Sequence, residues 1–132
     1  MKTNRHINKV AVVGSGIMGS RIACHFANIG VEVLLLDIVP FDLTQEQLKD
    51  KTIKNSIVND ALKSTLKSKP SPIYSKGFVS RITTGNLDDD LHKIADVDWI
   101  IEVVVERLYI KKQVFEKIEK FRTNGTLISS NT

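Results

Sequence analysis

The sequence has little of what marks several classes of protein. It contains a single cysteine, Cys24, which has no partner for an internal disulfide and no second thiol for a metal site. A reducing cytoplasm is therefore the expected location. The first apolar run, residues 10–13, ends at Gly14 and is too short for a signal peptide or a membrane span. We expect neither a bound metal nor a membrane partner.

Charge of one sign is not concentrated anywhere in the chain. The 19 Lys and Arg residues and the 15 Asp and Glu residues give a net charge of +4, and the basic residues are scattered from Lys2 to Arg122. This distribution argues weakly for anionic small ligands and against a nucleic-acid partner. With 132 residues and 42% hydrophobic content, the chain suits one domain with a core of its own.

The amino-terminal part alternates between strand-like and helical patterns. The β-branched apolar run Ile7–Val13 predicts a buried strand, and the apolar spacing from Gly16 to Asn28 predicts a helix. Gly30 is a suitable end for that helix. A second apolar run, residues 31–36, predicts another strand, which Asp37 closes.

The same alternation continues to the end of the chain. The predicted elements are a helix or helix pair over Gln45–Lys67, a surface loop over Pro70–Gly77, a strand over Val79–Thr83, a loop or short helix over Leu87–Ile94, a central strand over Val97–Val105, a helix over Ile110–Phe121 and a strand over Thr126–Ser129. Helical crossovers between strands require a mostly parallel sheet covered on both faces. We therefore predict a Rossmann-type, doubly wound α/β fold.

The run Gly14-Ser15-Gly16-Ile17-Met18-Gly19 lies between the first predicted strand and helix. A strand, a GxGxxG turn and a helix bind the pyrophosphate of a dinucleotide, because backbone N–H groups and the helix dipole point at it. The first glycine permits the tight turn, the second lets the backbone approach the phosphates, and the third packs the helix on the strand. We predict cofactor contacts from the three glycines and from Ile17 and Met18.

Asp37 completes the signature, because it ends the second predicted strand about 18 residues after Gly19. A carboxylate at this point accepts hydrogen bonds from ribose hydroxyls and repels the 2′-phosphate of NADP. No arginine follows among residues 38–40 to reverse that preference. The prediction is NAD, although FAD uses the same turn and stays open on these two signals.

A second group of charged residues follows the central predicted strand. Glu102 and Glu106 lie in or just after its apolar run, and ligands of an open α/β sheet sit beyond the carboxyl ends of the strands. Lys111 falls in the first turn of the next predicted helix, where a cation opposes the helix dipole. That position is compatible with a function and equally with a solvated lysine.

Taken together, these residues resemble the amino-terminal, NAD-binding domain of the 3-hydroxyacyl-CoA dehydrogenases. The matching segments are 9–20, 27–30, 35–38, 95–98, 101–102, 105–106, 114–115 and 129–132. The resemblance implies that Asp37 binds the adenosine ribose and that Glu106 and Lys111 lie near the nicotinamide. It also implies that Asn131, within the Ser-Asn-Thr ending, contacts the cofactor, and that Lys63, Lys67 or Lys69 touches coenzyme A phosphates.

The reaction implied by the resemblance is reversible hydride transfer between NAD and the 3-hydroxyl carbon of an acyl-CoA, as in fatty-acid β-oxidation. It needs a general base, which in the family is a histidine held by a glutamate after the Ser-Asn-Thr-Ser strand. The positions of His6, His25 and His92 do not suit that role. We expect no catalytic residue in this chain, which would be a truncated Rossmann domain without the family's helical second domain and homodimer interface.

Three functions remain open at this point. The first is the cofactor part of a 3-hydroxyacyl-CoA dehydrogenase, and the second is a non-catalytic Rossmann module that senses NAD(H). The third is another hydroxyacid dehydrogenase with the same cofactor domain. The segments 70–77 and 84–87 also look like longer bacterial members of the resembled family, some of which continue into an enoyl-CoA hydratase-like domain. The expectation is an NAD-binding fragment that does not turn over substrate.

Overall fold

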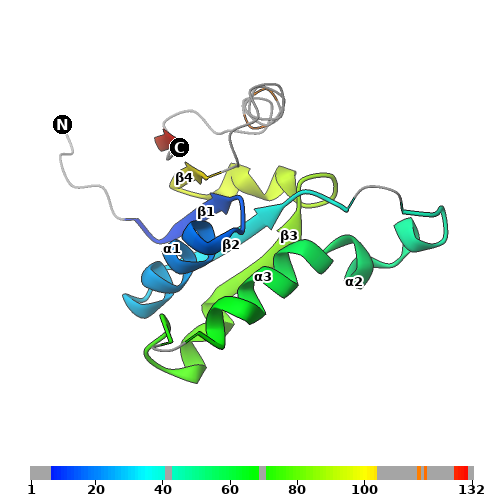
Figure 1. Cartoon of the computed structure of the whole chain (residues 1–132). Helices are drawn as coiled ribbons and strands as arrows, with labels where there is room; N and C mark the ends of the chain where they lie inside the picture. Colours follow the sequence, from blue (N-terminus) through cyan, green and yellow to red (C-terminus); the bar gives the residue numbers. More distant parts are fainter. Residues whose placement is uncertain are drawn as a thin grey trace.

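The computed structural model describes residues 7–40, 43–68, 71–103, 116 and 118, and the backbone of residues 127–130. Its centre is a five-stranded sheet with the strand order β3-β2-β1-β4-β5, and every pair of neighbouring strands is parallel (Figure 1). This is the strand order of a Rossmann sheet, so the predicted fold class is confirmed. The strands are β1 (Lys9–Val13), β2 (Glu32–Asp37), β3 (Ile82–Asn86), β4 (Trp99–Glu102) and β5 (Leu127–Ser130).

The central strands are buried on both faces, as their nearly continuous apolar sequences predict. In β1, Val10, Val12 and Val13 are fully buried. The register places Val13 beside Leu36 of β2 and Glu102 of β4. Because all strands are parallel, they end on the same side, which we call the carboxyl end of the sheet.

Two helices cover one face of the sheet. Helix α1 (Ile17–Asn28) connects β1 to β2, and α3 (Ser56–Leu66) leads to β3 after the short helices η1 (Gln47–Lys49) and α2 (Lys51–Lys54). The predicted helix pair is thus confirmed. The core beneath α1 and α3 includes Ala23, Ala27 and Val58, so small residues let α1 lie close to the strands.

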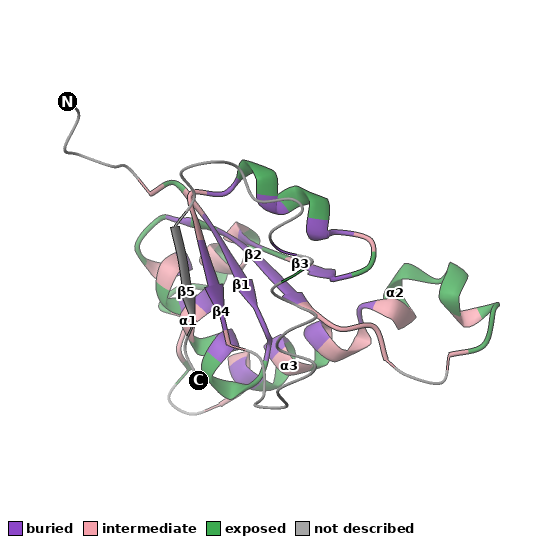
Figure 2. Ribbon diagram, turned by 90° about the horizontal axis from the view of Figure 1, so that it is seen from above, coloured by how far each residue is buried: buried purple, intermediate pink, exposed green. Residues whose placement is uncertain are grey.

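Among the described residues, the opposite face is covered by the 3-10 helix η3 (Leu91–Asp96), seen on the other side of the sheet in Figure 2. Its buried residues Leu91 and Ile94 pack with Leu34 and Leu36 of β2 and with Ile118. Apolar side chains of β1, β2 and β4 therefore alternate between two separate core clusters. The fold is doubly wound, as the sequence predicts.

Two predicted strand boundaries are wrong. The predicted strand over Val79–Thr83 begins only at Ile82, because the preceding residues form the 3-10 helix η2 (Lys76–Arg81). Arg81 in η2 donates a hydrogen bond from Nη1 to the carbonyl of Ala27 at 2.6 Å, and this tertiary contact overrides the local β-propensity.

The predicted strand over Val97–Val105 is shorter in the structure. Val97 still belongs to the turn after η3, since its N–H bonds to the carbonyl of Ile94 at 3.2 Å, and β4 covers only Trp99–Glu102. Residues 104 and 105 lie outside the described residues. Of the predicted helix over Ile110–Phe121, only residues 116 and 118 are described, and both are helical.

Candidate cofactor site

The turn between β1 and α1 is built on two glycines that the fold itself requires. Gly14 has a φ of 110°, in the left-handed region that favours glycine, and its N–H bonds to the carbonyl of Leu36 at 2.7 Å. A Cβ on Gly19 would lie 1.8 Å from the carbonyl oxygen of Gly14. The third glycine therefore allows α1 to pass directly over the turn.

Gly16 differs from both, because no described atom lies within 4 Å of the position where its Cβ would be. Its φ is −56° and its ψ is −173°, which other residues also adopt. Among the described residues, no side chain caps the start of α1. The absence of a side chain at Gly16 leaves room for an external group, and the site fits a dinucleotide pyrophosphate.

Two large apolar residues directly follow Gly16 at the start of α1. Ile17 is 78% exposed and Met18 is 53% exposed, in the first turn of a helix whose other apolar residues are mostly covered. Exposed apolar side chains beside a helix start suit a ligand that covers them. The structure therefore leaves the predicted contacts Ile17 and Met18 exposed next to Gly16, and their contact with the cofactor stays a prediction.

Asp37, at the end of β2, lies directly beside the glycine turn. Its Oδ2 accepts hydrogen bonds from the N–H of Ser15 at 2.8 Å and from the hydroxyl of Ser15 at 2.5 Å. Its Oδ1 accepts one from the N–H of Ile38 at 2.7 Å. The structure thus unites the glycines and the acidic residue that the sequence predicted to share one ligand.

Sequence reasoning did not identify Ser15 as part of this site. The signal was available in the strand pairing, because Val13 is in register with Leu36. Ser15 lies two residues after Val13, and Asp37 lies one residue after Leu36, so the two emerge side by side at the carboxyl end of the sheet. The buried Ser20 hydroxyl donates to the carbonyl of Ser15 at 2.6 Å, so the turn is also fixed from the helix side.

Glu102 ends β4 at the same end of the sheet and is fully buried. It is in register with Val13 of β1 and with Ser130 of β5. Glu102 in β4 and Asp37 in β2 therefore lie on opposite sides of β1. The other predicted cofactor contacts, Glu106, Lys111 and Asn131, lie outside the described residues.

A polar cluster that sequence reasoning missed follows β3, and we call residues 86–90 with their lysine and asparagine partners the Asn86 cluster. Asn86 is fully buried, and its Nδ2 donates to Oδ1 of Asn55 at 2.8 Å. Its Oδ1 accepts from the N–H of Asp89 at 2.7 Å. The ion pairs of the cluster join Lys54 to Asp89 at 2.7 Å, Lys51 to Asp90 at 2.9 Å and Lys93 to Asp90 at 3.1 Å.

The carboxyl groups of Asp89 and Asp90 in this cluster have lowered pKa values. The hydrogen bond from Lys54 lowers the pKa of Asp89, with help from Asn86. Burial acts to raise the pKa of Asp90, but bonds from the backbone of Asn86 and from Lys51 and Lys93 outweigh it, and the net shift is downward. The cluster fixes the start of α3 to the end of β3.

The same contacts give the direction of α3. Asn55 meets Asn86, and one turn later Asn59 accepts a bond from the hydroxyl of Thr84 at 2.6 Å, so α3 runs antiparallel to β3. Lys63 and Lys67, further along α3, therefore lie toward the amino end of the sheet, away from the glycine turn. Lys69 lies outside the described residues, and coenzyme A contacts by these lysines stay a prediction.

The described histidines do not lie in the glycine turn. His25 is exposed in the last turn of α1, and His92 is exposed in η3. His6 lies outside the described residues. Both described histidines are exposed, and the expectation that neither is catalytic stays a prediction.

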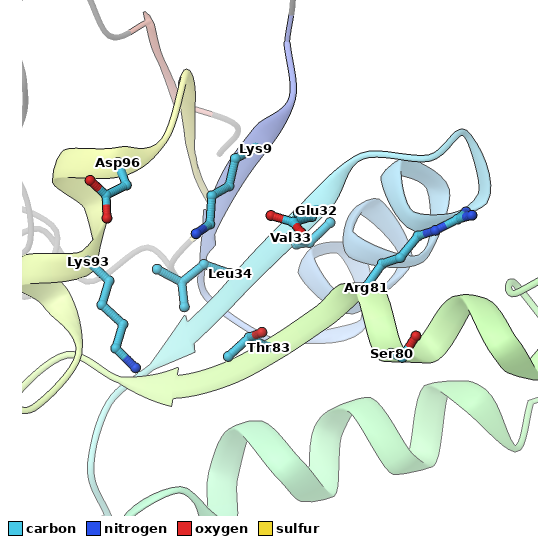
Figure 3. A pocket seen from close by; sticks show the side chains of 9 residues that line it. All are labelled: Lys9, Glu32, Val33, Leu34, Ser80, Arg81, Thr83, Lys93 and Asp96. Carbon is cyan, nitrogen blue, oxygen red and sulfur yellow. The ribbon is translucent and has the colours of Figure 1, made fainter.

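A hollow of about 450 Å³ occurs elsewhere, and Figure 3 shows the side chains that line it. Lys9 and Glu32 lie at the first residues of β1 and β2, and Arg81 directly precedes β3. The hollow is therefore at the amino end of the sheet, on the opposite side from the glycine turn. Its lining mixes cations with carboxylates and is separate from the cofactor site.

Comparisons with known proteins agree with this site. Residues 9–132 match the family model described as "3-hydroxyacyl-CoA dehydrogenase, NAD binding domain". A probable 3-hydroxyacyl-CoA dehydrogenase of Bacillus subtilis (strain 168) is 51% identical over 98% of this chain, which spans 17% of that protein. A probable 3-hydroxyacyl-CoA dehydrogenase of Deinococcus radiodurans is 40% identical over 96% of the chain, which spans 34% of that protein.

Among solved structures, 3-hydroxybutyryl-CoA dehydrogenase from Escherichia coli K12 is 29% identical to the chain, with a TM-score of 0.62. The match covers 97% of this chain and 25% of that one. The chain thus spans only a small part of the relatives it matches. It belongs to the family of 3-hydroxyacyl-CoA dehydrogenase NAD-binding domains, and its cofactor is NAD.

Proposed function

We propose that the chain is the cofactor-binding part of an NAD-dependent enzyme that oxidises 3-hydroxyacyl-CoA in fatty-acid β-oxidation. The observation that carries this proposal is the open space in front of Gly16, at a helix start that no described side chain caps. When bound, NAD supplies the hydride acceptor. The protein's own residues bind and orient the cofactor.

In this proposal the glycine turn holds the pyrophosphate. Gly14 and Gly19 shape the turn, and Gly16 lets the backbone N–H groups at the start of α1 reach the phosphate oxygens. Ile17 and Met18 cover the cofactor with apolar surface. The positive end of the α1 dipole supports the negative charge of the pyrophosphate without any cationic side chain.

We further propose that Asp37 binds the adenosine ribose through its carboxylate. That carboxylate lies beside the turn and is bonded to Ser15, so it is already placed next to the pyrophosphate position. Glu106, Lys111 and Asn131 are proposed to bind the nicotinamide end. Their assignment rests on the family's pattern, and Glu102, buried at the end of the neighbouring strand, supports that part of the sheet.

The general base is proposed to come from outside residues 1–132, as a histidine held by a glutamate, together with a helical second domain. The much greater length of the relatives supports this division. The 132-residue chain should then bind NAD without oxidising substrate. The complete protein is proposed to act on acyl-CoA and to form a homodimer.

A cytoplasmic location without nucleic-acid or membrane partners is part of the same proposal. The thiol of Cys24 is buried and has no second cysteine in the sequence with which to form an internal disulfide, which suits a reducing compartment. No helix within the described ranges is long and apolar enough to cross a membrane.

The test uses cofactor binding and turnover together. Fluorescence titration of the chain should show binding of NADH in preference to NADPH and FAD. Oxidation of 3-hydroxybutyryl-CoA with NAD should be detectable with the full-length protein and absent with the 132-residue chain. A full-length protein that binds NADH but never oxidises a hydroxyacyl-CoA would instead favour the NAD(H)-sensing module, and turnover by the chain alone would overturn the proposed division.

A further inference from the structure

Ser15 is the one non-glycine residue within residues 14–19 whose side chain is buried. It is 1% exposed, while the following side chains Ile17 and Met18 are largely exposed. Its hydroxyl points to Asp37 and donates to Oδ2 at 2.5 Å, beside the bond from its own N–H to the same oxygen at 2.8 Å. Being buried, Ser15 is not itself a contact for a bound nucleotide.

The Asp37 carboxylate is therefore held by three donors among the described residues. Two are backbone N–H groups, from Ser15 and Ile38, and these persist whatever side chain stands at position 15. The third, the Ser15 hydroxyl, depends on the serine. A hydroxyl bond to an ionised carboxylate is about twice as strong as a bond between neutral groups, so its loss frees the carboxylate to turn.

Discrimination between NAD and NADP depends on whether the carboxylate can turn. The 2′-phosphate of NADP brings a second negative charge to the place where the acid binds the ribose. A carboxylate that swings away relieves this repulsion, whereas one that is fixed maintains it. The stronger the bonds that fix Asp37, the greater the penalty on NADP.

We propose that Ser15 is a specificity-determining residue that acts through Asp37: its hydroxyl locks the carboxylate beside the glycine turn and so enforces the preference for NAD over NADP. The proposal rests on the proposed function, in which Asp37 binds the adenosine ribose. It assigns to the serine a role distinct from shaping the turn, because the turn geometry depends on Gly14 and Gly19 and on backbone bonds.

Ser20 provides a matched control. Its hydroxyl is also fully buried and also bonds within the turn, to the carbonyl of Ser15 at 2.6 Å, but it does not touch Asp37. Ser20→Ala therefore removes a buried hydroxyl of α1 that bonds to the same turn, and it leaves the bonds to the Asp37 carboxylate in place. A purely structural role for either serine would weaken NADH and NADPH by the same factor.

The experiment measures the dissociation constants of NADH and NADPH for the wild type, Ser15→Ala and Ser20→Ala by fluorescence titration. Ser15→Ala is expected to lower the ratio of the NADPH constant to the NADH constant by about tenfold, which is the effect of one charge-assisted hydrogen bond. Ser20→Ala is expected to keep the ratio within about twofold of wild type. Ser15→Gly, which also lacks the hydroxyl, should repeat the Ser15→Ala result and replaces it if that variant does not fold.

The outcomes separate the inference from the proposed function. If the wild type binds NADPH as tightly as NADH, the ribose contact of Asp37 is wrong and the inference falls with it. If the wild type prefers NADH and Ser15→Ala leaves the ratio unchanged, only the lock is wrong. An equal change of ratio in Ser15→Ala and Ser20→Ala would also overturn the lock.

Discussion

The carboxyl end of the sheet contains two regions that are built in opposite ways. At the glycine turn, between β1 and α1, the described residues leave open space in front of Gly16 and place no side-chain cap on the start of α1. At the Asn86 cluster, after β3, amide, carboxylate and ammonium groups all bond to one another. The same end of the sheet thus holds the glycine turn, which leaves room for a ligand, and the Asn86 cluster, whose polar groups bond to one another and stabilise the fold.

The contact between Gly19 and Gly14, where α1 passes over the glycine turn, serves the fold, as the Asn86 cluster does. Gly19→Ala would place a Cβ 1.8 Å from the carbonyl oxygen of Gly14, so the turn and α1 must separate. We expect a loss of about 3 kcal/mol in the free energy of unfolding, measured by urea denaturation. An unchanged urea midpoint would show that the turn is not packed as described.

Asn86→Ala tests the Asn86 cluster. It removes the partner of Asn55 and the acceptor for two backbone N–H groups in a fully buried place. The expected loss in the free energy of unfolding is about 2 kcal/mol, by the same measurement. Asn59→Ala is the control, because its bond to Thr84 is only partly buried and its loss should be smaller. Equal losses in the two variants would contradict the special role of the cluster.

Acid should weaken the Asn86 cluster. The pKa values of Asp89 and Asp90 are lowered in the folded protein, so their stabilisation is present above the unfolded pKa of about 3.9 and disappears as the pH falls through the folded values. In Asp90→Asn this stabilisation is already absent at Asp90. The stability difference between wild type and Asp90→Asn should be constant above about pH 5 and shrink below about pH 4. A difference that grows on acidification would contradict the assigned direction.

The last prediction concerns the reactivity of the Cys24 thiol, which lies in the core beneath α1 and belongs to neither region. Burial raises the pKa of the Cys24 thiol, although Arg21 acts in the opposite direction. The folded protein should therefore react with a thiol reagent such as 5,5′-dithiobis(2-nitrobenzoic acid) only at the rate of unfolding. Rapid reaction of the native protein at pH 8 would show that α1 does not cover this thiol.

The sequence predicted the glycine turn better than the Asn86 cluster for a physical reason. The turn, its strand and its helix are adjacent along the chain, so their signals are local. Asn55 and Asn86 are separated by 31 residues, and only the folded sheet brings them together. The Ser15 bond to Asp37 was missed for the same reason, since it spans 22 residues.

The boundary errors have a related cause. Val79 has the β-propensity that favoured an earlier start for the third strand, but the contact of Arg81 with the end of α1 keeps residues 76–81 in a 3-10 helix. Tertiary contacts thus decided where the strand begins, while local pattern decided that a strand exists. The roles of Glu106, Lys111 and Asn131 stay predictions, because these residues lie outside the described part of the chain.

The most direct measurement compares one substitution, Gly16→Ala, in cofactor binding and in stability. Because the new Cβ meets no described atom, the thermal midpoint should stay within about 2 °C of wild type. The affinity for NADH should fall by about tenfold or more, because the Cβ occupies the space of the pyrophosphate. Unchanged NADH affinity in Gly16→Ala would contradict the assignment of this turn as the cofactor site.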